Sequence, residues 1–259
     1  MRKVWNHTIE VKEGFVSRKR KVYPLLREER KEVREFVQEQ LRKRYIQLSK
    51  SPQIAPVFFV GKKYGKKRMV QDYRYLNKWT VKNNYPLPLI SDVLKNIGTK
   101  KVFTKIDLRW EYNNVWIKEG DKWKAVFTTS EGSFEPMVIF FGLMNSPATF
   151  QAMMNELLKD LINTGKVAAF IDDVIVGMGT KEGHNELVAE VIRRLKENNL
   201  YMKPEKCKWK VREVGFLGVV IGPKGIKMEE EKVKRVLEWP TLKCVKDVQK
   251  FLGLVNYYC

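Results

Sequence analysis

Two neighbouring carboxylates in the middle of an apolar run could bind a metal ion. Asp172 and Asp173 are preceded by Phe170-Ile171 and followed by Val174-Ile175-Val176, which predicts a strand, turn and strand hairpin with both carboxylates at its tip. Like charges held this close repel each other unless a cation neutralises them, so a divalent metal site is one interpretation. An ordinary solvated turn is the other.

A third carboxylate favours the metal interpretation. Residues 102–108 predict a short strand that ends at Asp107, and a bend that carries Tyr112 follows. Three carboxylates on two strand ends can hold two Mg²⁺ ions about 3.5–4 Å apart, which activates an attacking 3′-hydroxyl and stabilises a leaving pyrophosphate. The combination of Asp107 with the Asp pair therefore predicts nucleotidyl transfer.

The composition indicates a polyanionic partner. The 259 residues include 50 Lys and Arg against 30 Asp and Glu, which gives a net charge of +20 and a pI near 9.8. A ribosomal or histone-like structural protein would share this charge. The hydrophobic fraction of 44%, with seven Trp and thirteen Phe, instead allows a sizeable folded core of one large domain or two or three subdomains.

The cysteines and the apolar segments indicate the cellular compartment in which the protein resides. Cys207, Cys244 and Cys259 show no metal-ligand or disulfide spacing, so a reducing compartment is expected. No apolar run approaches the roughly 20 residues of a membrane span, and no signal-peptide core follows the first residues. We therefore expect a soluble intracellular protein.

Periodicity predicts the elements that would position these groups. His184 is expected at the surface or as a cap, because neither histidine has a plausible second ligand nearby. The lysine-rich hairpin tip at 61–67 is either a solvated turn or a lid over a nucleotide triphosphate. The predicted elements are helices at 28–45, 91–97, 146–165, 184–198, 229–239 and 245–258, a hairpin of 55–60 with 68–72, strands at 122–127, 134–140 and 214–221, and a turn at 222–225.

Several motifs follow one another in the order of a known family. They are Asp72-Tyr73-Arg74-Tyr75-Leu76-Asn77, Tyr85-Pro86-Leu87-Pro88, Ile106-Asp107-Leu108, the run from Phe141 to Gln151, Phe170-Ile171-Asp172-Asp173, Phe216-Leu217-Gly218 and Phe251-Leu252-Gly253-Leu254. From about Trp5 to the C-terminus the chain resembles reverse transcriptases of Ty3/gypsy-type LTR retrotransposons.

The resemblance implies an α+β right-hand polymerase fold, with an antiparallel palm sheet backed by helices, fingers and a truncated thumb. The expected reverse transcriptase domain covers residues 1–259. Its fingers are expected at about 24–100 and 115–145, its palm at 101–114 and 146–228, and a partial thumb at 229–259. Ribonuclease H, protease and integrase regions are expected to be absent from this chain.

The resemblance also implies an RNA-directed DNA polymerase that adds dNTPs to a primer 3′-hydroxyl by a two-metal mechanism, with Mg²⁺ or, in its place, Mn²⁺. The expected partners are RNA and DNA template-primers and dNTPs, without a membrane, in a longer Pol polyprotein located in the cytoplasm, a virus-like particle or the nucleus. The residues that match the family's site are Asp107, Asp172 and Asp173 for the metals, Lys62, Arg68, Tyr112 and Phe141 for the dNTP, with Tyr112 as the gate against a 2′-hydroxyl, and Leu217 and Gly218 for the primer grip.

Three positions depart from the family pattern. Glu111 stands where glycine is usual, directly before Tyr112, while Phe170 replaces the commoner tyrosine and Tyr64 replaces a small polar residue. Extra charge and bulk beside the substrate pocket predict low activity. The alternative function is therefore a catalytically impaired remnant that still binds nucleic acid. A viral RNA-dependent RNA polymerase would share the carboxylates but fits Tyr112 poorly.

Overall fold

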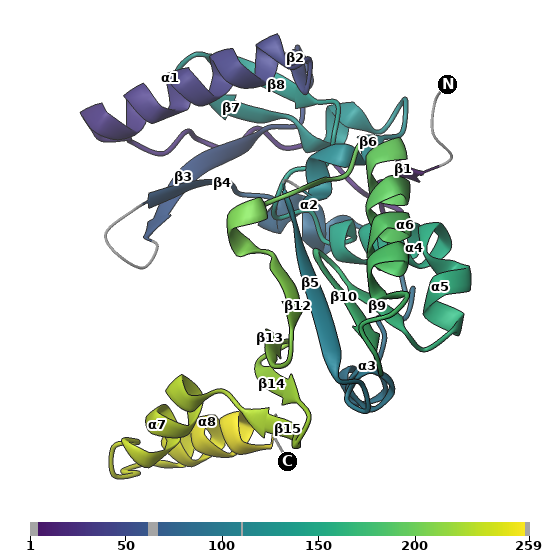
Figure 1. Cartoon of the computed structure of the whole chain (residues 1–259). Coiled ribbons are helices and arrows are strands. Elements are labelled where there is room, and N and C mark those ends of the chain that lie inside the picture. Colours follow the sequence, from purple (N-terminus) through teal and green to yellow (C-terminus); the bar gives the residue numbers. More distant parts are fainter. Residues whose placement is uncertain (1–4, 62–66, 110, 257–259) are drawn as a thin grey trace. The chain divides into compact units, whose positions relative to one another are not determined.

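The chain folds into two compact units, which are described separately. The computed structural model describes residues 5–61, 67–109 and 111–256 (Figure 1). Unit 1 comprises Met1–Leu87, Leu108–Leu157 and Leu195–Tyr201. Unit 2 comprises Pro88–Asp107, Leu158–Arg194 and Met202–Cys259.

Unit 1 is built on a sheet with the strand order β2-β8-β7-β3-β4. Strands β3 and β4 form the predicted antiparallel hairpin, and β3 also pairs with β7 in parallel. The elements are β1 (Asn6–His7), α1 (Arg27–Arg42), β2 (Ile46–Leu48), β3 (Ala55–Gly61), β4 (Lys67–Gln71), α2 (Arg74–Trp79), the 3-10 helices η2 (Glu111–Asn114) and η3 (Lys122–Ala125), β6 (Trp116–Ile117), β7 (Phe127–Thr129), β8 (Gly132–Pro136) and α4 (Ser146–Leu157).

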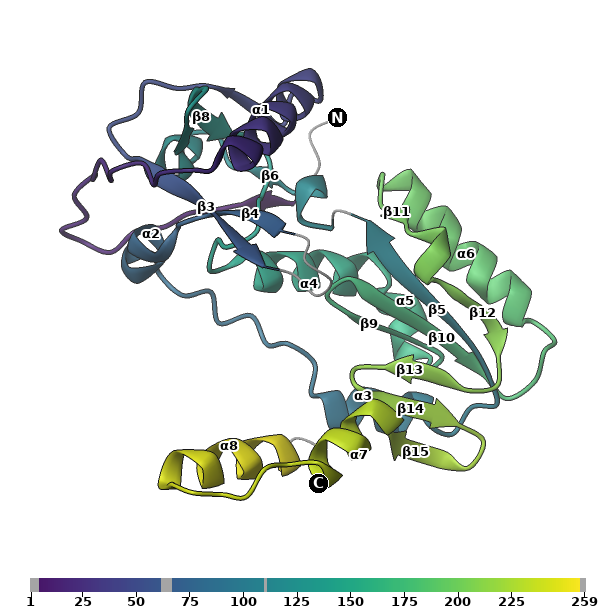
Figure 2. The same ribbon diagram turned by 90° about the vertical axis from the view of Figure 1, so that its left-hand side faces the viewer.

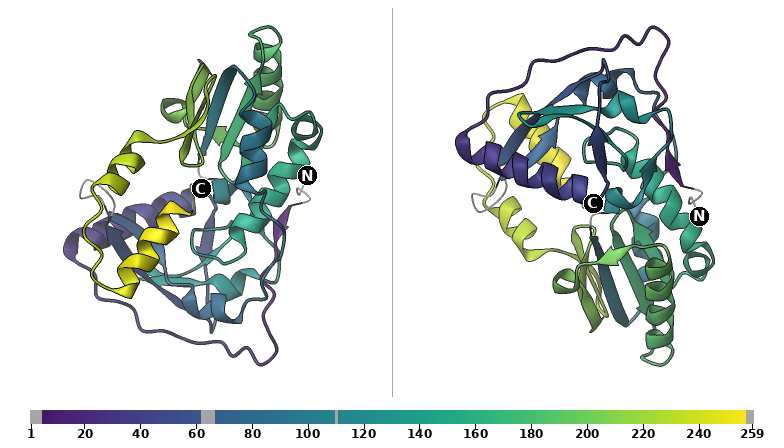
Figure 3. Two further views of the ribbon diagram at one scale, coloured as in Figure 1. Left: turned by 90° about the horizontal axis from the view of Figure 1, so that it is seen from below. Right: turned by 90° about the horizontal axis from the view of Figure 1, so that it is seen from above.

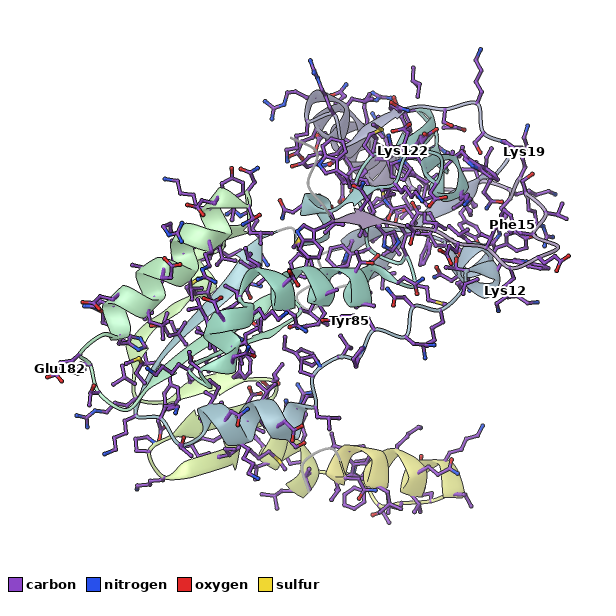
Figure 4. The ribbon with its side chains drawn as sticks, turned by 90° about the vertical axis from the view of Figure 1, so that its right-hand side faces the viewer. Lys12, Phe15, Lys19, Tyr85, Lys122 and Glu182 are labelled. Atoms are coloured by element: carbon purple, nitrogen blue, oxygen red, sulfur yellow. The ribbon has the colours of Figure 1, made fainter. Side chains whose placement is uncertain are left out.

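The first helix forms because its sequence is amphipathic and well capped. Glu28 and Glu29 lie in its first turn, where acidic side chains favour the helix dipole, and the Glu29 carboxylate accepts a hydrogen bond from the Leu26 backbone N–H. Its apolar side covers the sheet, where the Phe36 ring lies 6.5 Å from that of the buried Phe127. Figure 4 shows Tyr85 beside α4, and the Tyr85 hydroxyl accepts a 2.9 Å hydrogen bond from Asn155 of that helix.

Unit 2 is built on a sheet with the order β11-β5-β10-β9, in which β12 also pairs with β5 (Figure 2). Strand β5 crosses the unit boundary near its end, as does the end of α6. The elements are α3 (Ile90–Ile97), β5 (Val102–Arg109), α5 (Lys159–Asn163), β9 (Val167–Phe170), β10 (Asp173–Met178), α6 (His184–Glu197), β11 (Tyr201–Met202), the 3-10 helix η4 (Pro204–Lys206), β12 (Lys208–Val211), β13 (Val214–Phe216), β14 (Val219–Gly222), β15 (Gly225–Met228), α7 (Glu230–Leu237) and α8 (Val245–Val255).

The two faces of this sheet have different neighbours. On one face, Phe103 and Ile175 pack with α3 and the β13–β14 hairpin in a buried apolar cluster. On the other face, the Thr104 hydroxyl lies 2.8 Å from His184 Nε2 at the start of α6. The prediction that His184 lies at the surface is wrong, because the residue is only 1% exposed, and the alternative that it caps the helix stays a prediction. Burial lowers the pKa of this imidazole below its usual range.

Four predicted elements differ from the structure. Residues 122–125 form the 3-10 helix η3 and the strand starts only at Phe127, while β8 covers Gly132–Pro136. The helix from Ser146 is interrupted at Leu158, so that α5 follows as a separate element. The apolar run 214–221 is a hairpin, because Leu217 and Gly218 turn the chain between β13 and β14.

The last two helices confirm their prediction and expose many apolar side chains. Helices α7 and α8 follow one another at the C-terminal end of the chain (Figure 3), and the ring of Trp239, just after α7, is 5.6 Å from that of Phe251 in α8. Leu237 is 80% exposed and Val245 is 73% exposed. Within the described ranges, no helix is both long and apolar enough to cross a membrane.

Candidate active site

The strand register of unit 2 brings two of the predicted metal ligands together. Strands β5 and β10 are antiparallel, and Asp107 stands directly opposite Asp173. Residues opposite each other on antiparallel strands project from the same face. Asp172 is the adjacent turn residue, between the Phe170–Asp173 pair that closes the β9–β10 hairpin. The predicted hairpin with an acidic tip is therefore present, with the third carboxylate beside it.

The tip of this hairpin has a strained backbone. Ile171 adopts a φ of +53°, a left-handed conformation that is a genuine outlier for a β-branched residue. The turn has only two residues, Ile171 and Asp172, between the paired Phe170 and Asp173. Such conformations cost about 1–3 kcal/mol and persist only where the surrounding structure enforces them. Here the ladder pairs on both sides fix the position of Asp172.

Each of the two facing carboxylates holds a lysine. Lys203 Nζ lies 2.7 Å from Asp107 Oδ1, and Lys105 Nζ lies 2.9 Å from Asp173 Oδ1. Lys105 stands two residues before Asp107, so its side chain shares the face of the two carboxylates. All four side chains are between 15% and 22% exposed. The negative charge of the pair is thus neutralised within the sheet, and neither lysine was identified from the sequence.

The Asp173 carboxyl group is harder to ionise than usual. Burial raises its pKa, and the charges of Asp172 and Asp107 act in the same direction, while the contact with Lys105 opposes them. Within residues 5–61, 67–109 and 111–256, no three His, Cys, Asp or Glu side chains are grouped to hold a metal ion. The carboxylate oxygens nevertheless fit a hard cation such as Mg²⁺, and the lysine ammonium groups are cations already seated on them.

The predicted primer-grip residues form the tight turn of the β13–β14 hairpin. Phe216 pairs with Val219, and the two residues between them, Leu217 and Gly218, have φ values of +50° and +84°. Two left-handed residues make a hairpin turn whose twist matches that of the strands. Lys232 Nζ donates a 3.1 Å hydrogen bond to the Gly218 carbonyl, and Leu217 packs against the apolar cluster of unit 2.

Two of the predicted dNTP-binding residues contact each other in unit 1. The Arg68 guanidinium carbon lies 3.7 Å from the centroid of the Phe141 ring, a short cation–π distance. Arg68 comes from β4, and the Phe141 side chain is 40% exposed. The stacked ring orients the guanidinium, which can then present parallel N–H donors to a phosphate.

A pair of asparagines fixes the loop that carries Phe141. Asn77 Nδ2 donates a 2.7 Å hydrogen bond to the Gly142 carbonyl, and Asn77 Oδ1 accepts one of 3.0 Å from the Met144 N–H. Asn145 similarly donates to the Val81 carbonyl at 2.8 Å. These contacts give a physical role to both asparagines of the sequence motifs. They position Phe141 without touching its ring.

Arg68 and Phe141 also line a cavity of about 350 Å³ between α1 and β4. Gln40 of α1 belongs to its lining and is 5% exposed, and its Oε1 finds no hydrogen-bond donor in the described part of the chain. Lys67 lies at the same cavity and pairs with Glu29 at 2.6 Å. The cavity is therefore polar at several points and carries both acidic and basic side chains, among them Glu32 and Glu39.

The remaining predicted site residues cannot be placed in the same way. Lys62 and Tyr64 lie outside the described residues. Glu111 and Tyr112 belong to η2, and their side chains are outside the description. The residues that the sequence prediction missed are Lys105 and Lys203. The only sequence signal that these lysines belong to the site is their position. Lys105 stands two residues before an acidic strand end, and Lys203 precedes a Pro-Glu turn.

Comparison with known proteins gives consistent matches. A family model described as reverse transcriptase (RNA-dependent DNA polymerase) matches residues 60–221, more than half of the chain. The Transposon Tf2-3 polyprotein of Schizosaccharomyces pombe is 35% identical over 235 residues, which cover 91% of this chain and 18% of the polyprotein. The Tf2-7 polyprotein is 34% identical over the same share. The chain thus spans about a fifth of the length of these curated relatives.

Solved structures match over nearly the whole chain. A foamy viral protease-reverse transcriptase in complex with double-stranded DNA has a TM-score of 0.88 and 25% identity, and covers 99% of this chain and 44% of that one. The foamy viral enzyme with an RNA/DNA hybrid has a TM-score of 0.85 and 24% identity, with 99% and 34% covered. These matches confirm the predicted α+β polymerase fold.

Proposed function

Because the chain belongs to the reverse transcriptase family, we propose that it is an RNA-directed DNA polymerase that extends a primer 3′-hydroxyl with dNTPs. The observation that carries this proposal is the register of Asp107 opposite Asp173, with Asp172 on the adjoining turn, inside the region that the family model matches. The Tf2 polyproteins and the foamy viral enzyme support it. We assign the fingers to residues 24–100 and 115–145, the palm to 101–114 and 146–228, and a partial thumb to 229–259.

Asp107, Asp172 and Asp173 would hold the metal ions in this proposal. When bound, two Mg²⁺ ions would supply positive charge that lowers the pKa of the primer hydroxyl and offsets the charge of the leaving pyrophosphate. The β-ladder keeps Asp107 and Asp173 on one face, and the two-residue turn keeps Asp172 beside them. The residues thus act as a rigid acidic platform, which needs no rearrangement of the backbone to receive cations.

Arg68 and Phe141 would bind the incoming nucleotide. A guanidinium fixed on an aromatic ring offers a preorganised donor pair for phosphate oxygens, and its charge offsets the negative charge that develops during phosphoryl transfer. In our proposal Lys62 contributes further positive charge and Tyr112 excludes the ribonucleotide 2′-hydroxyl. The Leu217–Gly218 turn would hold the primer end.

A template-primer assay tests the proposal directly. The chain should extend oligo(dT) on poly(rA) with dTTP in Mg²⁺ or Mn²⁺, and Asp172→Asn should stop extension while the affinity for template-primer stays within about twofold. Affinity arises from dispersed Lys and Arg contacts and should be strongly salt dependent. With about five phosphate contacts, raising salt from about 50 to about 200 mM should weaken duplex binding by several hundredfold.

Glu111 favours a second candidate, a nucleic-acid-binding remnant with impaired catalysis. The same assay separates the two functions, because the remnant would bind the template-primer with the same salt dependence and extend it poorly. Glu111→Gly should then raise kcat/KM for dNTPs by about tenfold, equivalent to about 1.4 kcal/mol. Full activity in the parent chain with no gain in the variant would exclude the remnant.

A further inference from the structure

The ion pairs between the two lysines and the acidic platform are of a kind that can open without disturbing the backbone. Lys203 Nζ lies 2.7 Å from a carboxylate oxygen of Asp107, and Lys105 Nζ lies 2.9 Å from one of Asp173. Such an ammonium group is a compact point charge on a flexible stem, which can swing away without disturbing the backbone. Cations of this kind occupy oxygens that a metal ion would otherwise bind.

Lys203 is held in this place through its backbone. Its N–H donates a 2.8 Å hydrogen bond to the Asp107 carbonyl, and its own carbonyl accepts bonds from the Lys206 N–H at 2.9 Å and the Cys207 thiol at 3.2 Å. The buried Cys207 and the 3-10 helix η4 thus anchor the residue directly beside Asp107. Removal of the ammonium group alone should leave this anchorage intact.

Lys105 is held in a comparable way from the opposite side. It lies inside β5, opposite Ile175, and its side chain runs toward Asp173 on the neighbouring strand. Its Nζ is 6.0 Å from the centroid of the Phe216 ring, at the outer limit of a cation–π contact. Both facing carboxylates therefore have a positive group supplied from a fixed backbone position.

We propose that Lys203 and Lys105 are built-in counter-ions of the acidic platform, which neutralise Asp107 and Asp173 when no metal is bound and lower the affinity of the platform for divalent cations. This inference rests on the proposed function, since it assumes that the platform binds metal. A divalent cation must displace or repel two ammonium groups to bind, and the platform is kept ordered until it does. Lys203 and Lys105 are positioning residues in this proposal, and neither touches substrate.

The decisive measurement is Mn²⁺ binding to the full chain without nucleotide or nucleic acid. Titration calorimetry should show that Lys203→Gln binds Mn²⁺ about threefold to tenfold more tightly than the parent, because a repelling charge has been removed. Lys203→Arg keeps the charge and should stay within about twofold of the parent. Lys224→Gln removes an exposed lysine of the β14–β15 turn and serves as the matched control, with no expected change.

Thermal unfolding supplies a second readout: Lys203→Gln should gain Mn²⁺ affinity but lose stability in the absence of metal. In a chelator, Lys203→Gln should unfold at a lower temperature than the parent, because Asp107 has lost its partner. Added Mg²⁺ should then raise the unfolding temperature more in Lys203→Gln than in the parent. A lysine with a merely structural role would lower stability in both conditions and leave the Mn²⁺ affinity unchanged.

Several results would overturn the proposal. Equal or weaker Mn²⁺ binding by Lys203→Gln would show that the lysine does not compete with metal. Lys105→Gln repeats the test at the second carboxylate, and failure of both variants to fold would contradict the idea of displaceable counter-ions. A parent chain that binds Mn²⁺ but cannot extend a primer would reject the proposed function alone. Undetectable Mn²⁺ binding by the parent and by both lysine variants would reject both.

Discussion

The two units each contain a carboxylate site, and the two sites are built differently. In unit 1, Asp72 has a side chain with no exposed surface, and it accepts hydrogen bonds from Arg20 at 2.6 Å, from the Tyr23 hydroxyl at 3.0 Å and from both ends of the Arg74 guanidinium at 2.7 Å. In unit 2, Asp107 and Asp173 each hold a lysine. Two arginines pair with the carboxylate of the first site, whereas a lysine pairs with each of the two facing carboxylates of the second.

Asp72 and Asp173 also differ in the direction of their pKa shifts. The hydrogen bonds from Arg74 hold the pKa of Asp72 well below its usual range, despite its burial. Burial instead raises the pKa of Asp173. The neighbours of Asp72 therefore stabilise its anion, whereas the surroundings of Asp173 disfavour the ionised form.

The largest expected effect is on catalysis at the second site. Asp172→Asn should reduce primer extension by at least about a thousandfold, which corresponds to about 4 kcal/mol of barrier, because a neutral amide is a poor ligand for a hard cation. Single-turnover extension at saturating dNTP measures this loss. Asp72→Asn serves as the control: its folded fraction should keep a rate near that of the parent. Retention of a tenth of the parent rate in Asp172→Asn would falsify the assigned metal role.

The next effect is a loss of stability, and among the carboxylate variants it should be largest at the first site. Asp72→Asn leaves the Arg20 and Arg74 guanidinium groups without their anion, and breaking a buried ion pair in this way costs about 3–5 kcal/mol. Because Arg74 is 76% exposed, we expect the lower end, about 3 kcal/mol. Urea unfolding measures the difference. A loss below about 1 kcal/mol would show that Asp72 resembles the unit 2 carboxylates after all.

The pH dependence of unfolding sharpens the same comparison. The folded-state pKa of Asp72 is depressed below its unfolded value near 4, so its contribution to stability is present above pH 4 or so and is lost as the pH falls through the folded pKa. The parent should therefore lose stability below about pH 4, and Asp72→Asn should lose less over the same interval. Parallel curves would contradict the pairing of Asp72.

The strained hairpin tip should show a smaller effect of opposite sign. Ile171→Gly relieves about 1–2 kcal/mol of left-handed strain. About half of this gain is lost, because glycine raises the conformational entropy of the unfolded chain. We expect a net stabilisation of about 0.5–1 kcal/mol together with slower extension, because Asp172 is held less firmly. Ile171→Val keeps the β-branch and is the control. A less stable glycine variant would indicate that the Ile171 side chain contributes more packing than strain.

The smallest effect is expected for the stability of Asp173→Asn. Because the folded-state pKa of Asp173 is raised, its ionised form destabilises the fold as the pH rises above the unfolded pKa. Removal of the charge should change the free energy of unfolding by between zero and a gain of about 1 kcal/mol in a chelator at neutral pH. Thermal melting beside Asp72→Asn checks this, and a loss as large as that of Asp72→Asn would remove the distinction between the sites.

Local patterns were sufficient to predict much of the fold and the acidic tip. The alternation around Asp172 and the strand before Asp107 identified β5, β9 and β10, because each signal lies within a few residues of sequence. The register that places Asp107 opposite Asp173 joins residues far apart in the chain. It could be expected from the chemistry of the three carboxylates but not from the pattern of either strand.

The errors arose where tertiary contacts override local preference. The apolar run 214–221 contains no polar turn residue, so its pattern predicts a single strand. In the structure Leu217 and Gly218 turn the chain back into a hairpin. His184 looked like a surface residue, since its partner Thr104 is 80 residues away. Lys105 and Lys203 were missed for the same reason, because their carboxylate partners become visible only through the sheet.

The hydroxyl of Thr104 has a consequence for the way unit 2 folds. It contacts His184 across 80 residues of sequence and accepts a hydrogen bond from the Lys210 N–H across 106. Loops of that length close slowly, because their entropy is lost before their contacts form. We therefore expect β5 to gain protection from hydrogen exchange late and together with α6 and β12, as one cooperative unit that unfolds as a whole.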